Sequence, residues 1–304
     1  MPAAPERLPL WTWWLPLPLF HLATWISLAT RFSEGTASWY MPFALGLVCS
    51  LWWGPRVLPA LYLNALLSVP LWGLDWRWAP LYALPESLAV GLAWWQLRRA
   101  EFDVALADFG QLLRFILLGV LLPTALVALG LQTLLWLLGD QPGSAWAATS
   151  LTLWLADSLS VLAVSTPLLT YLSPWLRRRG WLRASQRDGL EQVPAALRQV
   201  PPWPLLLALL LGMPWLLGAL PLTLNLPLIG VLMLGLGLFW GFGGALCGAL
   251  LSALMVLTLP LLRGFGDIAS WLDPQRLELH FGVLLFMLAS LLVGRSLSDL
   301  RLAL

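Results

Sequence analysis

The chain has 304 residues, of which 60% are hydrophobic and only 11% are charged. An average soluble domain carries roughly 25% charged residues, and a single hydrophobic core stops growing near this chain length. A soluble fold is therefore excluded, and the bilayer must act as the solvent. Only helices and closed barrels satisfy their backbone groups in lipid, and unbroken apolar runs such as 205–217 contradict the alternation of a barrel strand. We expect an all-α, polytopic transmembrane helix bundle.

A helix needs about 20 apolar residues to cross a bilayer, and ten segments are candidates. The second candidate is short and begins near Pro42, which is typical of a tilted or partial span. The eighth and ninth meet at 241–244, a glycine-rich stretch that permits a tight turn, so we expect eight to ten crossings. The candidates are residues 8–30, 39–54, 57–74, 78–97, 111–138, 146–172, 203–219, 222–240, 241–262 and 277–297.

The basic residues are all arginines, 17 in number. If the N-terminus is cytoplasmic and the spans alternate, only Arg31, Arg77, Arg263 and Arg276 fall outside, and the other 13 arginines fall inside. This bias follows the positive-inside rule and predicts that both termini are cytoplasmic. The absence of lysine is typical of a GC-rich bacterial gene, so we expect a multi-pass protein of the bacterial inner membrane. Many tryptophans lie near predicted span ends, where they would act as interfacial anchors.

The main hydrophilic stretch, 173–202, separates a first half (1–172) from a second half (203–297) of the predicted membrane domain. Between Arg183 and Gln199 it is predicted to form a short amphipathic helix on the inner leaflet. After the last span, leucines 297, 300 and 304 follow at the spacing of a heptad seam. We therefore expect that residues 298–304 begin a cytoplasmic signalling helix or coiled coil, that an output domain follows, and that the protein is a homodimer.

Ionisable residues at membrane depth are functional candidates. Glu86 in the fourth candidate span and Asp157 in the sixth have no arginine at the same depth. An unpaired carboxylate in hydrocarbon takes a proton rather than remain charged. One interpretation is a polar pocket formed by Asn64, Glu86 and Asp157, with Trp154 as a wall. The other is a set of interhelical hydrogen bonds that hold the bundle together, and the sequence leaves both open.

The remaining polar residues at membrane depth do not indicate a catalytic or metal-binding site. Gln132 and Asn225 are expected to pack, and His21 and His280 to lie at interfaces. No spacing of ligands predicts a metal site, no cofactor is expected, and no catalytic motif or nucleic-acid-binding pattern is present in the sequence.

Three stretches carry a resemblance to a known family. They are PFALGLVCSLWWGPRVLPALYLNALLS from Pro42, LPESLAVGLAWWQLRR from Leu84 and WLADSLSVLAVSTPLL from Trp154. Their order and spacing resemble the bacterial membrane-associated sensor domain of the first type. The matching positions are Pro42, Gly46, Gly54, Arg56, Pro59, Asn64, Glu86, Arg98, Arg99, Trp154, Asp157, Leu162 and Pro167. In the second half, Trp240 stands where this family usually has arginine.

The resemblance implies a signal-input domain N-terminal to a histidine kinase, or alternatively to a diguanylate cyclase, and it implies no particular stimulus. We expect such a sensor to bind a small molecule, a lipid or a membrane partner protein. A small-molecule transporter is the rival class, because Pro42, Pro59, Pro85 and Pro123 interrupt spans and transporters also place carboxylates near the midplane. A membrane-embedded enzyme is a further class, and it is disfavoured because the sequence shows no nucleophile paired with a base.

Overall fold

The structure is a computed structural model of the chain, and it describes residues 8–33, 36–37, 39–182, 200–220, 222–262 and 274–304. The described residues are almost entirely helical, which confirms the all-α prediction. They form two compact units. The predicted surface helix of 183–199 and the glycine-rich loop at 264–266 lie outside the described residues.

The first unit contains the described residues up to Ala105 and those from Arg114 to Leu182. A small antiparallel pair of strands, β1 (Arg31–Ser33) and β2 (Thr36–Ala37), turns the chain between two of its helices. The helices are α1 (Trp11–Trp14), α2 (Pro16–Leu28), α3 (Met41–Trp53), α4 (Leu58–Ser68), α5 (Ala79–Tyr82), α6 (Leu84–Arg99), α8 (Leu122–Leu138), α9 (Trp146–Pro167) and α10 (Ser173–Arg178), with short 3-10 turns at Pro55–Val57, Val69–Trp72, Trp76–Trp78 and Gly143–Ala145.

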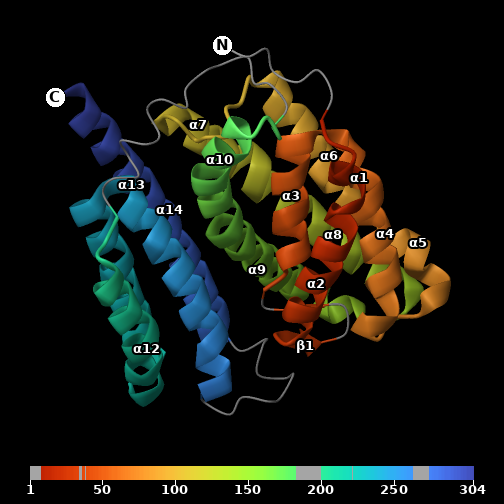
Figure 1. Cartoon of the computed structure of the whole chain (residues 1–304). Helices are drawn as coiled ribbons and strands as arrows, with labels where there is room; N and C mark the ends of the chain where they lie inside the picture. Colours follow the sequence, from red (N-terminus) through yellow and green to blue (C-terminus); the bar gives the residue numbers. More distant parts are fainter. Residues whose placement is uncertain (1–7, 34–35, 38, 183–199, 221, 263–273) are drawn as a thin grey trace. The chain divides into compact units, whose positions relative to one another are not determined.

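Helix α9 is the centre of the first unit and packs against both α3 and α8 (Figure 1). Every residue from Leu155 to Thr166 is buried. A buried helical stretch needs partners for its polar groups, and two serines of α9 find them on neighbouring helices. The Ser158 hydroxyl lies 2.9 Å from that of Thr124 on α8, and the Ser165 hydroxyl donates to the Ala44 carbonyl of α3 over 3.1 Å.

Two stretches of the first unit widen into π-helix, at Phe115–Leu121 and Leu168–Leu172. Each ends two residues before a proline, Pro123 and Pro174 respectively. A proline ring lacks a backbone donor and clashes with the carbonyl four residues earlier in an α-helix. The wider π-turn lets the helix continue past the ring, so the prolines bend these helices without ending them.

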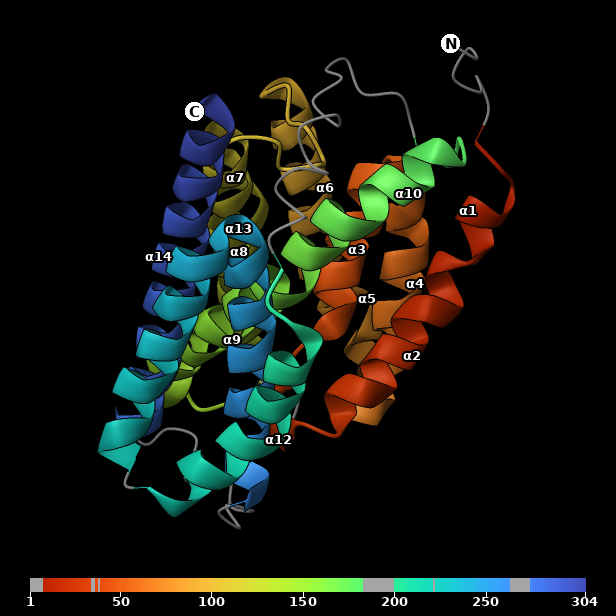
Figure 2. The ribbon, with the colours of Figure 1, turned by 60° about the vertical axis from the view of Figure 1, so that its left-hand side comes forward.

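The second unit contains Leu106–Leu113 and the described residues from Val200 on. Its helices are α7 (Phe109–Arg114), which continues into the first unit at its last residue, α12 (Trp203–Ala219), α13 (Leu222–Leu262) and α14 (Pro274–Ala303). Figure 2 shows α13 and α14 side by side. Sequence patterns did not predict that a short piece of the first half, 106–113, belongs to this unit.

Helix α13 is a hairpin of two antiparallel arms. Gly241 has φ 60° and ψ −143°, a conformation that residues with a side chain rarely adopt. A Cβ built on Gly244 would lie 2.0 Å from the Leu236 carbonyl oxygen, and one on Gly248 would lie 3.3 Å from the Met233 Cα. The two arms therefore touch through their backbones, which confirms the predicted tight turn between the eighth and ninth candidate segments.

Within the described residues, four helical stretches are long and apolar enough to cross a membrane: Phe109–Leu138, Gly143–Arg178, Leu224–Met255 and Leu277–Ala303. Two shorter apolar helices are Met41–Trp53 and Trp203–Ala219. The third long stretch contains the turn of α13. The chain is thus an integral membrane protein, and each of the ten segments predicted from sequence contains helix.

The close backbone contact in α13 predicts that Gly244→Ala destabilises the protein. The added methyl group would force the two arms apart, at a cost of about 1–3 kcal/mol in the free energy of unfolding. The midpoint temperature of unfolding in detergent measures this loss. Gly235→Ala is the matched control, because its Cβ meets no atom within 4 Å. An equal effect of the two substitutions would contradict the hairpin contact.

Candidate ligand-binding site

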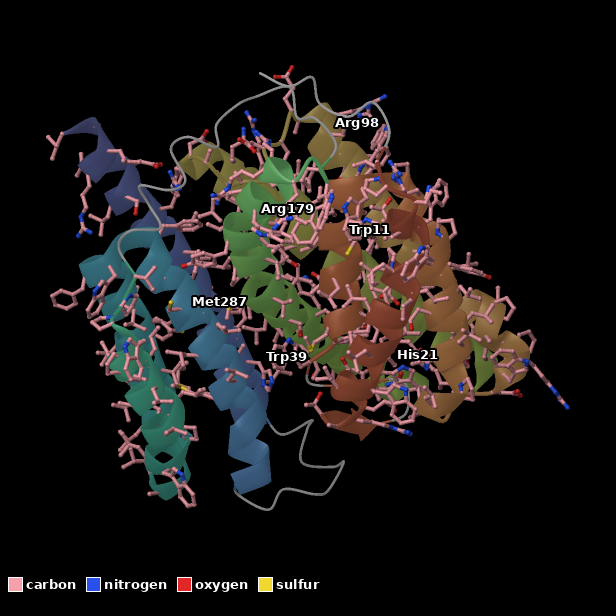
Figure 3. The ribbon with its side chains drawn as sticks, in the orientation of Figure 1. Trp11, His21, Trp39, Arg98, Arg179 and Met287 are labelled. Atoms are coloured by element: carbon pink, nitrogen blue, oxygen red, sulfur yellow. The ribbon has the colours of Figure 1, made fainter. Side chains whose placement is uncertain are left out.

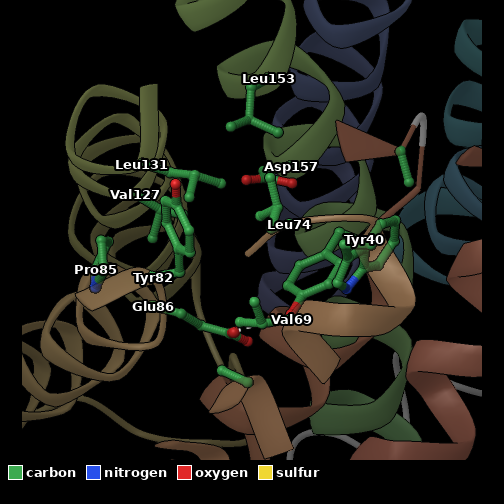
Figure 4. A pocket seen from close by; sticks show the side chains of 13 residues that line it. Tyr40, Val69, Leu74, Tyr82, Pro85, Glu86, Val127, Leu131, Leu153 and Asp157 are labelled. Atoms are coloured by element: carbon green, nitrogen blue, oxygen red, sulfur yellow. Dashed lines mark hydrogen bonds between the residues drawn. The ribbon is translucent and has the colours of Figure 1, made fainter. Parts of the chain in front are cut away.

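A cavity of about 60 Å³ lies in the first unit, where the chain enters α3, leaves α4 and begins α6 (Figure 4). Helices α8 and α9 supply the rest of its wall. The lining combines apolar side chains, such as Val69, Val127 and Leu153, with the carboxyl groups of Glu86 and Asp157. This volume is large enough for a few water molecules or a very small ligand.

Glu86 stands in the first turn of α6, directly after Pro85, and only 5% of the residue is exposed. The first-turn position favours a carboxyl group because the backbone N–H groups there are not bonded within the helix. Its Oε2 atom accepts a hydrogen bond of 2.9 Å from the Tyr40 hydroxyl. Its Oε1 atom is buried and has no hydrogen-bond partner among the described residues.

Asp157 lies midway along α9 and is 2% exposed. Figure 4 shows its carboxyl group beside Leu131 and Leu74, on the cavity side of the helix. The Oδ1 atom is buried, and no described residue forms a hydrogen bond with it. None of the described residues that line the cavity is basic, so nothing in the wall itself balances two ionised carboxylates.

Asn64 does not line this cavity, although the sequence predicted a pocket that included it. Its amide nitrogen donates to the Thr24 hydroxyl over 3.1 Å, and its Oδ1 lies 3.3 Å from Nδ1 of His21. Both partners belong to α2. Asn64 is fully buried and joins α4 to α2, because an amide at this depth requires hydrogen-bond partners from a neighbouring helix.

Trp154 is likewise not part of the cavity wall. It points toward α8, where its indole nitrogen donates to the carbonyl oxygen of Leu121 over 3.0 Å. Leu121 ends the first π-helical stretch, and the irregular turn leaves this carbonyl available to a side chain. Of the four residues predicted for the pocket, the structure brings together Glu86 and Asp157 only.

The remaining residues of the family-like pattern shape the helices. Pro42 and Pro59 occupy first-turn positions of α3 and α4, where a proline removes no helical hydrogen bond. Gly54 ends α3 with φ 84°. A Cβ on Gly46 would lie 2.8 Å from the Leu61 side chain of α4, so this glycine permits close helix packing. Pro167 is the last residue of α9, ahead of the second π-helical stretch.

Arginine and tryptophan side chains meet at one end of the first unit, and Figure 3 shows Trp11, Arg98 and Arg179 there. Arg56 donates from Nε to the Trp53 carbonyl over 2.8 Å and lies 5.7 Å from the ring centre of Trp13. Such pairs suit an interface, because the ring stays in the apolar layer while the guanidinium reaches polar groups. Further arginine–tryptophan contacts join Arg98 to Trp94, Arg99 to Trp95 and Arg179 to Trp175 and Trp181.

Three aromatic residues of the cavity were not predicted from sequence. Tyr40 binds Glu86, and its ring lies 5.9 Å from that of Trp72 in an edge-on arrangement. Tyr82 also lines the cavity, and its hydroxyl donates to Asp140. The available signal was that the chain has only four tyrosines, and that a buried tyrosine hydroxyl usually has a polar partner.

The described residues contain no group of three histidine, cysteine, aspartate or glutamate side chains that could hold a metal ion. Comparisons with protein-family models, with curated proteins and with solved structures return no match to this chain.

The hydrogen bond between Tyr40 and Glu86 predicts an energetic coupling between these residues. Tyr40→Phe should lower the free energy of unfolding by about 1–2 kcal/mol in the natural chain, because it removes a bond to a buried carboxyl group. In a Glu86→Met background the same change should cost close to nothing. Thermal or chemical unfolding in detergent, arranged as a double-mutant cycle, measures the difference.

Tyr62→Phe provides the control for this cycle, since the Tyr62 hydroxyl is exposed and bonds only to the Pro80 carbonyl at 3.2 Å. Its effect should be small and the same in both backgrounds. Additive effects of Tyr40→Phe and Glu86→Met would contradict the predicted coupling.

Proposed function

We propose that this chain is the membrane-embedded signal-input domain of a bacterial sensor protein, with a histidine kinase as its output and a diguanylate cyclase as the alternative output. The proposal joins the resemblance to the sensor family with one structural observation. The stretch 106–113 connects the helices that line the cavity to the helix that ends the described chain.

Two of the helices that line the cavity are joined to each other through this stretch of chain. Helix α6 contributes Pro85 and Glu86 to its wall, and α8 contributes Val127 and Leu131. The chain between these two helices includes 106–113, which belongs to the second unit. Any movement of α6 relative to α8 must therefore act on this connecting stretch.

The connecting stretch is bonded to α14. The guanidinium of Arg295 donates to the Ala107 carbonyl oxygen, and the Phe109 backbone N–H donates to Oδ2 of Asp299 over 3.0 Å. Arg295 also pairs with Asp299 through its Nε, at 2.9 Å. A shift of α14 along its neighbours would exchange or break these bonds, and shifts of about 1–2 Å are a usual scale for helix signalling.

Arg295 is 1% exposed, which is unusual for an arginine. A charge buried to this extent depends on its hydrogen-bond partners. Its guanidinium carbon lies 5.2 Å from the centre of the Phe242 ring, next to the α13 turn. The Phe242 backbone N–H donates to the Ser298 hydroxyl over 2.9 Å. A desolvated charge tolerates few alternative positions, so a displaced α14 would occupy a distinct second packing.

Helix α14 continues without interruption to Ala303, past the last apolar segment. Leu300 is 57% exposed, so this seam residue is uncovered within a single chain. A second copy of the chain would cover it in a parallel coiled coil. This supports the proposed dimer and a signalling helix that leads onward to an output domain.

The proposed topology places the arginine-rich end of the first unit in the cytoplasm of a bacterial inner membrane, with eight to ten crossings. The positive-inside bias supports it. The cavity lies near the β1–β2 turn, at the other end of α2 and α3, so a stimulus would enter from outside the cell. The stimulus then acts by favouring one packing of the helices over another.

Substitution of Arg295 should change the basal output of the full-length protein. In Arg295→Met the bonds to Ala107 and Asp299 are lost while most of the side-chain volume remains. Coupling between sites is typically about 1–3 kcal/mol, which corresponds to a change of roughly 5-fold or more in kinase or cyclase activity. The assay is autophosphorylation or cyclic dinucleotide synthesis in membranes with matched protein amounts.

Ser296→Ala is the matched control, because Ser296 is the next residue of α14 and its exposed hydroxyl bonds only within the helix, to Leu292. Equal output from Arg295→Met and Ser296→Ala would refute the proposed route.

The coding region that follows Leu304 offers a direct test, since a kinase or cyclase domain there is expected. A C-terminal green fluorescent protein fusion should fluoresce, and an alkaline phosphatase fusion at the same position should be inactive.

A small-molecule transporter is the second candidate. Two π-widened helices and a pair of buried carboxyl groups favour it, because transporters use broken helices and protonatable sites at depth. Uptake of a solute by proteoliposomes that contain the purified chain, with no effect of any stimulus on a cytoplasmic output, would establish the transporter and exclude the sensor.

A further inference from the structure

The cavity holds two acceptor atoms that no described residue satisfies. They are Oε1 of Glu86 and Oδ1 of Asp157, on residues that are 5% and 2% exposed. A buried acceptor without a donor is costly and is rare in folded proteins. Both atoms belong to groups that line the same cavity, so a ligand inside it is the natural source of the donors that they lack.

The charge of the wall decides what kind of donor fits. Two carboxyl groups line the cavity, and the described lining residues include no arginine or histidine. An anionic ligand would meet like charge wherever a carboxyl group of the wall is ionised, whereas a cation would itself favour the ionised form of both groups. A neutral alcohol carries a single donor. A primary ammonium group carries a positive charge and three N–H donors, so it complements both carboxyl groups.

The rest of the lining suits an organic cation better than a metal ion. Tyr40, Trp72 and Tyr82 present aromatic rings, whose faces attract ammonium groups. Val69, Val127 and Leu131 give an apolar surface for a short alkyl chain. The hydroxyls of Tyr40 and Tyr82 already donate to Glu86 and Asp140, so the wall offers fewer uncommitted oxygen ligands than the six to eight that a calcium-like ion takes.

We propose that this cavity binds the primary ammonium group of a small aliphatic amine, with Glu86 and Asp157 as its acceptors. The volume of about 60 Å³ limits the enclosed part to a few heavy atoms. The amine is either a free molecule or the headgroup of an aminophospholipid, which presents the same ammonium group. The inference rests on the proposed function, because it names the stimulus class of the sensor cavity.

The test is direct binding of propylammonium chloride to the purified chain, measured by isothermal titration calorimetry in an amine-free phosphate buffer. Propylammonium should bind at least about tenfold more tightly than 1-propanol or sodium propionate, which share its size but lack its charge or reverse it. Equal binding of all three, binding of propionate alone, or no binding would overturn the proposal. Binding that sodium or potassium chloride abolishes at equal concentration would assign the site to an inorganic cation instead.

Three variants assign the binding to the cavity. Glu86→Gln and Asp157→Asn remove one charge each at nearly constant volume, and each should weaken propylammonium binding by at least about tenfold. Asp75→Asn is the control, because Asp75 is exposed and caps a 3-10 turn, a role that asparagine fills equally well. Unchanged affinity in both cavity variants would overturn the assignment. If a variant fails to fold, the comparison of the three ligands on the natural chain still tests the proposal.

Nanodiscs distinguish the two sources of the ammonium group. In discs of phosphatidylglycerol alone the cavity is open to propylammonium. If an aminophospholipid is the natural occupant, adding phosphatidylethanolamine should weaken propylammonium binding, whereas a free amine as occupant predicts no change.

Failure of this inference is separable from failure of the sensor proposal. If a stimulus other than an amine loses its effect on the output in Glu86→Gln, the sensor proposal stands and the amine proposal fails. If the chain takes up an amine but no stimulus changes an output, the amine proposal stands and the sensor proposal fails.

Discussion

A polar group at membrane depth cannot turn to water, so the bundle has to supply its hydrogen bonds. This constraint organises the first unit. Every residue of α9 from Leu155 to Thr166 is buried, and the hydroxyls of Ser158 and Ser165 bond to α8 and α3. Asn64 joins α4 to α2 in the same way. Oε1 of Glu86 and Oδ1 of Asp157 are among the buried polar atoms that no described residue satisfies, and both belong to groups that line the cavity.

Irregular backbone gives this bundle its functional geometry. Proline residues widen two helices into π-turns, and the first of these lies in the chain that joins α7 to α8. The longer connection from α6 to α8 also includes the stretch 106–113, whose Ala107 carbonyl accepts a hydrogen bond from Arg295 of α14. Two helices that line the cavity, α6 and α8, are thus joined by a connection that also bonds to α14.

The second unit is built around the hairpin of α13. Its two arms approach so closely that Gly244 has no room for a methyl group, and Gly241 makes the turn in a conformation suited to glycine. Phe242 follows this turn and contacts both Arg295 and Ser298 of α14. The turn therefore helps to position α14, the last helix of the described chain.

Composition alone determined that the chain is helical and lies in a membrane, because no soluble core could hide its apolar surface. The sequence also marked Glu86 and Asp157 as unusual and placed a turn at Gly241. It could not show that Asn64 and Trp154 face away from the cavity, that Tyr40 binds Glu86, or that 106–113 joins the second unit. Helices that are apolar on all sides have no polar face to indicate their orientation. The facing of each side chain was decided only by which helices pack together in the tertiary structure.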